Sequence, residues 1–243
     1  MIEIKDITKV YAGKTVVNVP GLEIRKGESI GLVGNNGAGK TTLFRMILDL
    51  IRPEKGEILS NGEVVAGSEH WKNYTASFLD EGFLIDYLTP EEYLYFIGGL
   101  QGQNKAQVDE FLVTLTDFFN GEILKKGKYI RDLSKGNQCK VGAASCLLQN
   151  PELLMLDEPF ANIDPSTQFR LKSILKDLNK TKGVTTLISS HDLNHITDVC
   201  DRILLMEKGV IIKDIATSSS TLNELEEYFG VGQIASAKIT IEE

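Results

Sequence analysis

Short apolar runs separated by turn residues predict strands in the N-terminal part of the chain, at positions 2–4, 16–19 and 29–33. Pro20-Gly21 is the turn signal that follows the second run. The third run leads into a glycine-rich loop, after which apolar positions recur at helical spacing over residues 41–50, before Arg52-Pro53. The pattern therefore predicts a strand, a loop and a helix in direct succession.

The pattern becomes helical in the middle of the chain, between residues 89 and 150. From residue 153 onward, apolar strand runs at 153–156, 184–189 and 203–206 alternate with helical patterns at 168–178 and 192–200. Such alternation builds parallel sheets with crossover helices. We therefore expect an α/β fold with a mostly parallel sheet and a helical subdomain inserted at about 89–150. A polar linker at 218–221 and an amphipathic segment at 222–229 precede the tail.

Composition narrows the class of protein. The chain has 243 residues, of which 42% are hydrophobic and 25% charged, and we expect one domain over residues 1–243. The formal net charge of -8 argues against nucleic acid as a main partner, because phosphate backbones bind basic surfaces. No apolar run approaches the ~20 residues that span a bilayer. The N-terminus lacks the zones of a signal peptide, and we expect Cys139, Cys146 and Cys200 to be reduced.

The loop after the third strand run carries the strongest chemical signal. Residues 34–42 match G-x-x-x-x-G-K-[ST], the P-loop or Walker A motif, in its required place between a strand and a helix. Glycines let backbone N–H groups point at phosphates, and the start of a helix favours anions. We expect a nucleotide triphosphate to be bound by Gly34, Asn35, Asn36, Gly37, Ala38, Gly39, Lys40, Thr41 and Thr42.

Specific roles follow for the end of this loop and for a second, acidic motif. Lys40 is expected to reach the β- and γ-phosphates, and the Thr41 hydroxyl to hold Mg²⁺. A P-loop alone leaves kinases, GTPases and motor ATPases open. Residues 153–159, Leu-Leu-Met-Leu-Asp-Glu-Pro, predict a strand that ends in two carboxylates, where parallel sheets bind their ligands. Asp157 is a candidate for the Mg²⁺ site, and Glu158 for the base that acts on the attacking water.

The order of motifs resembles the ABC ATPase family over nearly the whole chain, from about residue 2 to about residue 229. The P-loop and the acidic motif are accompanied by Leu-Ser-Lys-Gly-Asn-Gln at 133–138, Ala-Asn-Ile-Asp at 161–164 and Ser-His-Asp at 190–192. The resemblance implies an ATPase with a P-loop NTPase (RecA-like) core and an N-terminal antiparallel β subdomain. It makes Glu158 the catalytic carboxylate, His191 the switch histidine on the γ-phosphate, and Tyr11 the aromatic side chain on adenine.

The resemblance also implies partners. In this family the signature, here Ser134, Lys135, Gly136 and Asn137, contacts the γ-phosphate of ATP bound by the other subunit, and Asp164 matches the loop that crosses this interface. We therefore expect a pair of ATP-binding subunits, homodimeric or heterodimeric. A separate membrane-spanning subunit is expected to dock near Glu81 and residues 83–95, which would place the chain at the cytoplasmic face of the membrane.

Three positions in two motifs depart from the family pattern. The signature is usually Leu-Ser-Gly-Gly-Gln, whereas Lys135 and Asn137 stand in its third and fifth places, and the lysine is a variation of exporter-like members. Glu81 aligns with a glutamine that links the Mg²⁺ and water site to the membrane subunit. A carboxylate at this place adds negative charge beside Asp157, so we expect Glu81 to approach the metal and to alter the dependence on Mg²⁺.

Other functions stay open. Soluble ABC proteins of translation or DNA repair usually carry two cassettes or a long coiled-coil insertion, and neither pattern is seen here. Glu81 and Asn137 leave room for an ATP-binding regulatory module with little turnover. His191 and His195 have a spacing that suits a metal, but further clustered ligands are missing from the sequence around them. The leading hypothesis is an ATPase subunit that powers export or other transport of a substrate that this subunit does not specify.

Overall fold

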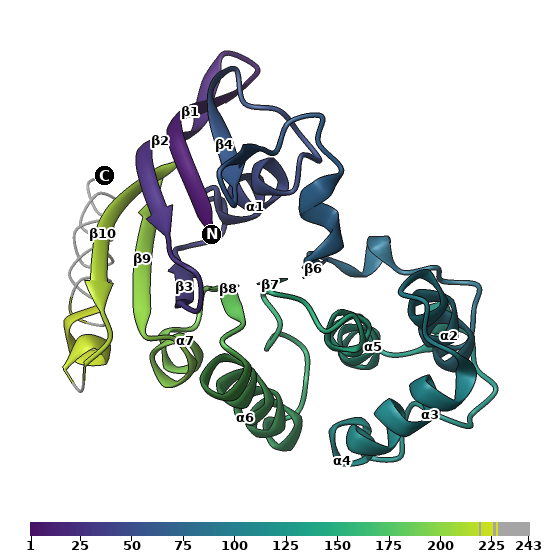
Figure 1. Cartoon of the computed structure of the whole chain (residues 1–243). Helices are drawn as coiled ribbons and strands as arrows, with labels where there is room; N and C mark the ends of the chain where they lie inside the picture. The colour runs from purple at the N-terminus through teal and green to yellow at the C-terminus, as the bar shows by residue number, and fades with distance from the viewer. Residues whose placement is uncertain (219, 226, 228–243) are drawn as a thin grey trace, which may run out of the picture.

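Two sheets with a helix between them form the framework of the protein. A computed structural model describes residues 1–218, 220–225 and 227 (Figure 1). The smaller sheet is antiparallel and has the order β2-β1-β4-β5. Its strands are β1 (Ile2–Tyr11), β2 (Lys14–Ile24), β4 (Lys55–Ser60) and β5 (Glu63–Val64).

The larger sheet has the order β10-β9-β3-β8-β7-β6. Its strands are β3 (Ser29–Val33), β6 (Thr75–Phe78), β7 (Leu153–Asp157), β8 (Thr185–Ser190), β9 (Arg202–Glu207) and β10 (Val210–Ala216). The strands from β9 to β6 run parallel, and β10 is antiparallel at the edge. Parallel neighbours need crossover connections, which the helices supply. The mostly parallel sheet predicted from the sequence is present.

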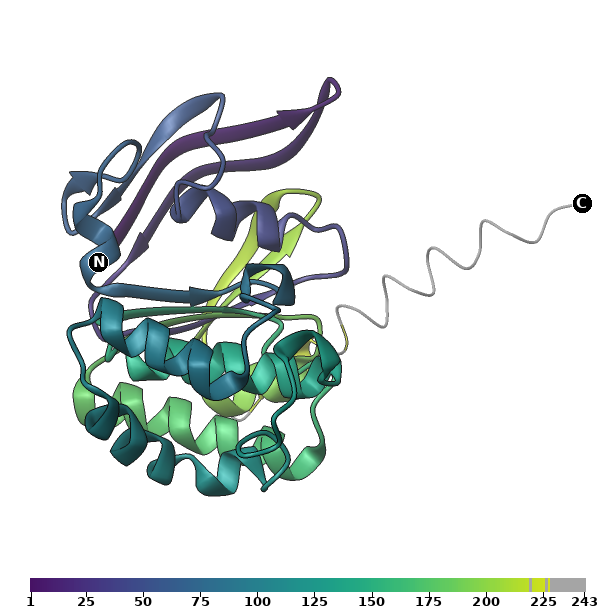
Figure 2. The ribbon, with the colours of Figure 1, turned by 90° about the vertical axis from the view of Figure 1, so that its right-hand side faces the viewer.

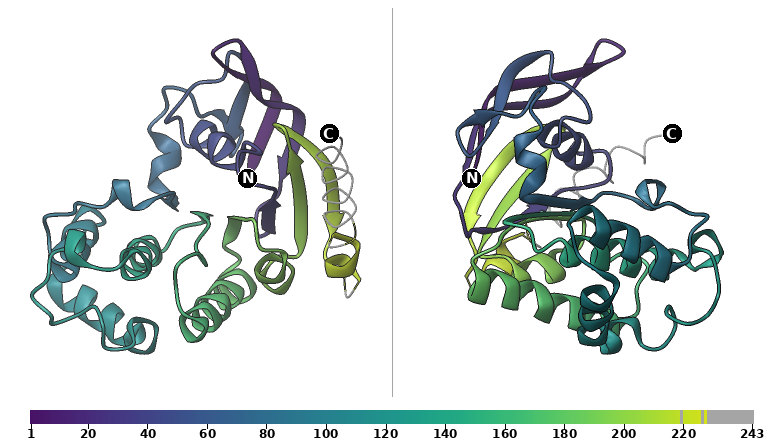
Figure 3. Two further views of the ribbon diagram at one scale, coloured as in Figure 1. Left: turned by 180° about the vertical axis from the view of Figure 1, so that it is seen from behind. Right: turned by 45° about the vertical axis from the view of Figure 1, so that its right-hand side comes forward.

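Helices cover both faces of the larger sheet. Helix α1 (Lys40–Ile47) lies between the two sheets, whereas α6 (Pro165–Lys182) and α7 (Leu193–Val199) lie on the opposite face (Figures 1 and 2). A group of helices extends to one side, with α5 nearest the sheet (Figure 3). It comprises α2 (Pro90–Leu100), α3 (Lys105–Thr114), α4 (Thr116–Phe119) and α5 (Lys135–Leu148). Short 3₁₀ turns are η1 (His70–Asn73), η2 (Glu81–Phe83) and η3 (Ile130–Asp132).

Successive side chains of the parallel strands point to opposite faces of the sheet and form two apolar cores. On β7, Leu153 and Met155 face the core shared with α1 and the smaller sheet, whereas Leu154 and Leu156 face the core shared with α5, α6 and α7. Each of these side chains is at most 1% exposed. A strand that is buried on both faces is apolar throughout, which explains the continuous apolar run that predicted β7.

Several element boundaries differ from the sequence prediction, among them the end of β1 and both ends of α6, and two of the differences have a clear physical cause. Strand β2 continues through Pro20-Gly21, because β2 lies at the edge of its sheet, where a missing N–H donor is tolerated. Helix α1 ends at Ile47 rather than at Leu50, since Asp49 has a left-handed backbone with a φ of 50°.

The C-terminal prediction falls partly outside the described residues. Positions 226, 228 and 229 of the predicted amphipathic segment, and the tail after them, are not among the residues that the structure describes. Within the described ranges, no helix combines the length and the apolar character that crossing a bilayer requires.

Helix α5 packs against β6 at a glycine. A Cβ atom at Gly142 would lie 2.3 to 2.6 Å from three ring carbons of Phe78, whose side chain is buried. We predict that Gly142→Ala lowers the free energy of unfolding by about 1–3 kcal/mol, because overpacking outweighs the roughly 1 kcal/mol by which alanine favours a helix. Urea denaturation measures the difference.

Gly99 in α2 provides the matched control, because no atom lies within 4 Å of a Cβ placed there. Gly99→Ala should leave the free energy of unfolding unchanged or raise it. Equal losses of stability in the two variants would contradict the packing explanation.

Candidate active site

The carboxyl ends of neighbouring parallel strands bring the predicted residues together. Strands β3, β8 and β7 are adjacent in the larger sheet. The P-loop follows β3, His191 follows β8, and Asp157 is the last residue of β7. Glu81 lies in the turn after β6, the next strand along. Because these ends share one edge of the sheet, residues far apart in the sequence can form one site there.

The P-loop depends on its glycines. Gly37 and Gly39 have φ angles of 81° and 109°, in the left-handed region that glycine adopts without a steric penalty. A Cβ atom at Gly34 would lie 2.3 Å from the carbonyl oxygen of Met206, so the start of the loop packs tightly against β9. Helix α1 begins directly after Gly39, so the free N–H groups at the start of the helix point toward the loop. Asn35 and Asn36 are exposed, whereas Ala38 is buried.

Lys40 joins the P-loop to the acidic end of β7. Its side chain is 6% exposed, and its ammonium group donates to the carbonyl oxygen of Gly34 at 2.6 Å. The same group pairs with Glu158 Oε1 at 3.3 Å. The next residue, Thr41, donates its hydroxyl hydrogen to Asp157 Oδ2. The two P-loop residues with predicted side-chain roles therefore contact the two predicted carboxylates.

Asp157 is held from both sides. Besides the Thr41 hydroxyl, it accepts a hydrogen bond from the hydroxyl of Ser189 on β8. Burial raises the pKa of the Asp157 carboxyl, and the hydroxyls of Ser189 and Thr41 oppose this rise. Ser189 is not predictable from the sequence alone, because its role follows from the register that pairs it with Asp157 across β7 and β8.

Glu158 adopts an unusual backbone conformation beside His191. Its φ of 48° lies in the left-handed region, which costs a residue other than glycine about 1–3 kcal/mol. Its N–H donates to the carbonyl oxygen of Ser189 at 3.2 Å and to the Ser189 hydroxyl at 3.0 Å, and these bonds stabilise the conformation. Glu158 Oε2 accepts from the His191 N–H at 3.3 Å and contacts His191 Nδ1 at 2.9 Å. Lys40, Glu158 and His191 thus form a continuous chain of contacts.

Two oxygen donors fit a Mg²⁺ ion that is shared with phosphates. The Thr41 hydroxyl and the Asp157 carboxylate are adjacent, and Mg²⁺ usually takes its remaining ligands from phosphates and water. Within residues 1–218, 220–225 and 227, no group of three or more His, Cys, Asp and Glu side chains could hold a metal by itself. His195 contacts the ring of Phe160 instead, with 4.9 Å between ring centroids. Glu81, the third residue predicted for Mg²⁺, pairs with Lys135.

The signature segment lies apart from the P-loop of its own chain. Ser134 caps α5 by accepting a hydrogen bond from the Asn137 N–H at 3.3 Å. Lys135 pairs with Glu81 at 3.4 Å, so two of the three residues that depart from the family pattern contact each other. In the part of the chain that the structure describes, no hydrogen bond or ion pair joins residues 134–137 to residues 34–42.

The ring contact of Tyr11 and the polar contacts of Asp164 in the described part of the chain are with residues outside the P-loop and the β7 carboxylates. Tyr11 is the last residue of β1 and is 48% exposed, and its ring centroid lies 5.3 Å from the ammonium nitrogen of Lys9. Asp164 caps α6 by accepting from the Thr167 N–H at 3.0 Å. Hydrogen bonds from the side chains of Ser166 and Thr167 hold the pKa of Asp164 well below its usual range.

Comparison with known proteins decides the family. A family model described as ABC transporter matches residues 17–161. The chain belongs to the ABC transporter ATP-binding proteins. The uncharacterized ABC transporter ATP-binding protein YhcH of Bacillus subtilis (strain 168) is 31% identical over 240 residues, which cover 94% of this chain and 74% of YhcH. The methionine import ATP-binding protein MetN of Carboxydothermus hydrogenoformans is 31% identical over 231 residues, or 92% of this chain and 68% of MetN.

A solved ABC cassette has the same fold. The dimeric structure of the ATP-binding cassette MJ0796 in a post-hydrolysis state, bound to ADP and Pi, has a TM-score of 0.79 to this chain. The match covers 90% of this chain and 100% of that one at 23% identity, so the likeness concerns the fold. The predicted α/β P-loop NTPase fold is confirmed. As a member of its family, the chain is an ABC ATPase that binds ATP.

The buried Asp157 carboxylate gives the ABC cassette a pH-dependent cost in stability. Because burial raises the pKa of Asp157 in the folded chain, ionisation favours the unfolded chain and lowers stability as the pH rises through the folded pKa. We predict that Asp157→Asn, without nucleotide or Mg²⁺, has a higher free energy of unfolding than the natural chain at pH 7. The difference should shrink as the pH falls below the folded pKa, where the carboxyl is protonated.

Urea denaturation at pH 7 and at a series of lower pH values tests this expectation. A lower free energy of unfolding for Asp157→Asn at pH 7 would show that the lost hydrogen bonds outweigh the stability gained by no longer burying a charge.

Proposed function

We propose that this ABC ATPase is one of two ATP-binding subunits of a transporter and acts beneath a separate membrane-spanning subunit at the cytoplasmic face of the membrane. ATP-driven closure of the two subunits powers export or other transport. The observation that supports hydrolysis most directly is the contact chain from Lys40 through Glu158 to His191, beside the pair of Thr41 and Asp157. Membership of the ABC transporter family supports coupling to transport.

The proposed reaction uses these contacts in turn. P-loop N–H groups and Lys40 bind the phosphates, and the ammonium group exchanges the Gly34 carbonyl for a phosphate oxygen. Thr41 and Asp157 would hold Mg²⁺, which would supply positive charge that neutralises the phosphate oxygens. Glu158 orients the attacking water and accepts its proton. His191 fixes the Glu158 carboxylate through its N–H and places its imidazole ring beside the γ-phosphate.

A second subunit is part of the proposal because the signature segment makes its polar contacts away from the P-loop of its own chain. Ser134 and Lys135 are exposed, and no hydrogen bond or ion pair of residues 134–137 in the described part of the chain reaches the P-loop. The start of α5 can instead offer its N–H groups to ATP on a second subunit, where they stabilise negative charge. The dimeric form of the MJ0796 cassette supports this arrangement.

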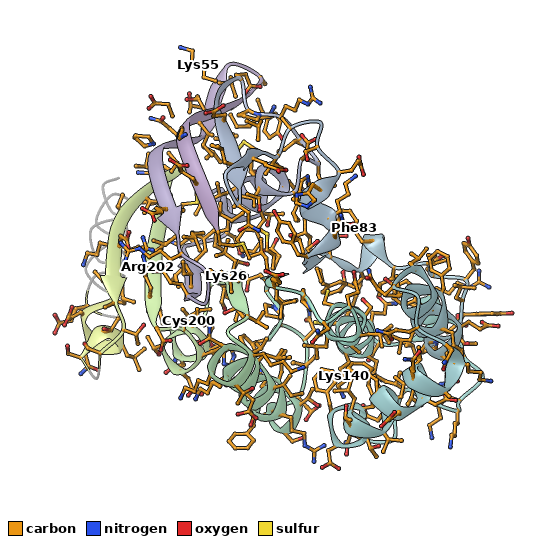
Figure 4. All side chains as sticks on the ribbon, in the orientation of Figure 1. Lys26, Lys55, Phe83, Lys140, Cys200 and Arg202 are labelled. Carbon is orange, nitrogen blue, oxygen red and sulfur yellow. The ribbon has the colours of Figure 1, made fainter. Side chains whose placement is uncertain are left out.

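The membrane subunit is proposed to dock beside Glu81, at residues 83–95. Phe83 and Tyr87 are 51% and 65% exposed there (Phe83 is labelled in Figure 4). Two backbone hydrogen bonds tie residues 86 and 88 to residues 130–131, so the exposed Tyr129 lies nearby. Clustered exposed aromatic side chains are typical of protein contact sites.

Export is the favoured direction. Lys135 in the third place of the signature is a variation of exporter-like ABC proteins. The relative MetN is named for import of methionine, so sequence identity at this level does not by itself determine the direction of transport. The cargo is determined by the membrane subunit, because the substrate path lies there.

Co-purification from detergent-solubilised native membranes tests the transporter proposal. We expect the tagged chain to recover one polytopic membrane protein, identified by mass spectrometry. A Phe83→Ala, Tyr87→Ala double variant should lose this protein because the exposed aromatic contact is gone. Phe169→Ala is the control, since Phe169 on α6 is 75% exposed but far along the chain from the proposed dock. Recovery from the soluble fraction alone, or with ribosomes or DNA factors, would favour a soluble ABC protein instead.

Substitutions at the site test the roles in hydrolysis. Glu158→Gln should bind ATP, accumulate as a dimer and hydrolyse ATP at least about 100-fold more slowly, because the amide cannot accept the proton of the water. Lys40→Ala should lose turnover because the phosphates lose their ammonium partner. Steady-state ATPase assays and sedimentation measure both effects. Full activity in either variant would remove the role assigned to that residue.

A further inference from the structure

Lys140 is a buried lysine that the proposed reaction does not use. Its side chain lies on α5 and is 2% exposed (labelled in Figure 4). The ammonium group pairs with Glu122, which follows α4, at 3.1 Å, and with Asp164, the cap of α6, at 3.5 Å. A buried charge is costly unless it is paired, so these two carboxylates explain how the lysine is accommodated.

The same face of α5 contacts the loop of residues 159–164 at three of its residues. Gly136, Cys139 and Lys140 are three and four residues apart, a spacing that places them on one side of a helix. A Cβ atom at Gly136 would lie 2.2 Å from the carbonyl oxygen of Asn162. The Cys139 thiol donates to the carbonyl oxygen of Pro159 at 3.4 Å. Lys140 completes the row with its ion pair to Asp164.

The loop is also fixed on its other side. Phe160 is 2% exposed, and its ring contacts that of His195 on α7, the helix that follows His191. The Gln168 side chain on α6 donates to the Phe160 carbonyl oxygen at 3.0 Å. The loop begins directly after Glu158, at the end of β7, and it packs against α5. Ser134 is the N-terminal cap of that helix.

We propose that Lys140 is a positioning residue that holds the loop of residues 159–164 and the Ser134 end of α5 as one surface, the surface that meets the second subunit. The inference rests on the proposed function for the existence of that second subunit. Asp164 keeps its bonds to Ser166 and Thr167 when Lys140 is removed, so α6 remains capped. What is lost is the tie between α6 and α5.

If Lys140 has this role, its removal should affect nucleotide binding and the pairing of subunits differently. In the described part of the chain, Lys140 makes no hydrogen bond or ion pair with the P-loop, Asp157 or Glu158, so nucleotide binding to one subunit should persist without it. Pairing of two subunits should weaken, because both segments must be placed correctly at the same time. A residue that only stabilised the fold would change both properties together.

The test uses the full chain with Glu158→Gln, so that ATP is retained. Lys140→Met keeps the length of the side chain and removes its charge, and Lys140→Arg restores the charge. We expect Lys140→Met to leave the affinity for ADP unchanged and to weaken ATP-dependent dimerisation, measured by sedimentation, by about tenfold or more. Lys140→Arg should restore dimerisation. Dimerisation of Lys140→Met as tight as that of its parent would overturn the proposal.

Lys172 supplies a matched control. Its ammonium group pairs with Asp198 at 3.2 Å and its side chain is 17% exposed, but this pair lies between α6 and α7. Lys172→Met removes an ion pair of α6 at this other place and should leave ATP-dependent dimerisation as tight as in the parent. Equal weakening of dimerisation in the two variants would assign the effect to stability and overturn the proposal.

Hydrogen exchange separates this inference from the proposed function. In the ADP-bound single chain, Lys140→Met should accelerate amide exchange in residues 159–164 and at the start of α5 but not in the P-loop. If the Glu158→Gln parent does not dimerise with ATP, the proposed pairing is wrong, and exchange alone decides the role of Lys140. Unchanged exchange in residues 159–164 would then overturn that role.

Discussion

Two hydroxyl groups hold the Asp157 carboxylate at the buried end of β7, and the rest of the site depends on this arrangement. Thr41 brings the start of α1 to the carboxylate, and Ser189 brings β8 to it. A buried carboxylate without such donors would be strongly disfavoured. Ser189 also accepts a hydrogen bond from the Glu158 N–H, so one serine fixes both acidic residues relative to each other. The P-loop, β7 and β8 are thereby held in register at the nucleotide edge of the sheet.

Local charge, rather than net charge, suits this site to an anion. The chain carries a formal charge of -8, which on its own would repel a triphosphate. The P-loop offsets this with N–H groups at a helix start and with the nearly buried Lys40. Glu158 divides its two oxygens between Lys40 and His191. An incoming phosphate can therefore compete with the carboxylate for the lysine, while the histidine keeps the carboxylate in place.

The parts of the site that were predictable from the sequence are those whose geometry is local. The P-loop and the Asp157-Glu158 pair are contiguous motifs next to strong strand and helix patterns, so their place in the fold followed from a few residues. Ser189 could not be found in this way, because its contact with Asp157 depends on which strands are neighbours and on their register. The same is true of the ion pair between Glu81 and Lys135, which joins residues from different elements.

Errors in the predicted fold came from residues whose effect depends on sheet position. The Pro20-Gly21 pair is usually a turn signal, and it is harmless in β2 because that strand has a neighbour in its sheet on one side. The end of α1 was placed too late because Leu50 fits the helical spacing, whereas the left-handed backbone of Asp49 ends the helix first. Apolar spacing alone carries no information about backbone conformation at a single residue.

The proline in β2 has a further effect on how this sheet meets other molecules. Alternate N–H groups of a strand point to the same side. The Asn18 N–H points away from β1 and donates to the carbonyl oxygen of Gly209 at 2.7 Å. Pro20 stands where the next outward N–H would lie, so a strand from another molecule would find no donor at that point. The residue that obscured the strand in the sequence therefore removes one point at which a foreign strand could pair with the edge of the smaller sheet.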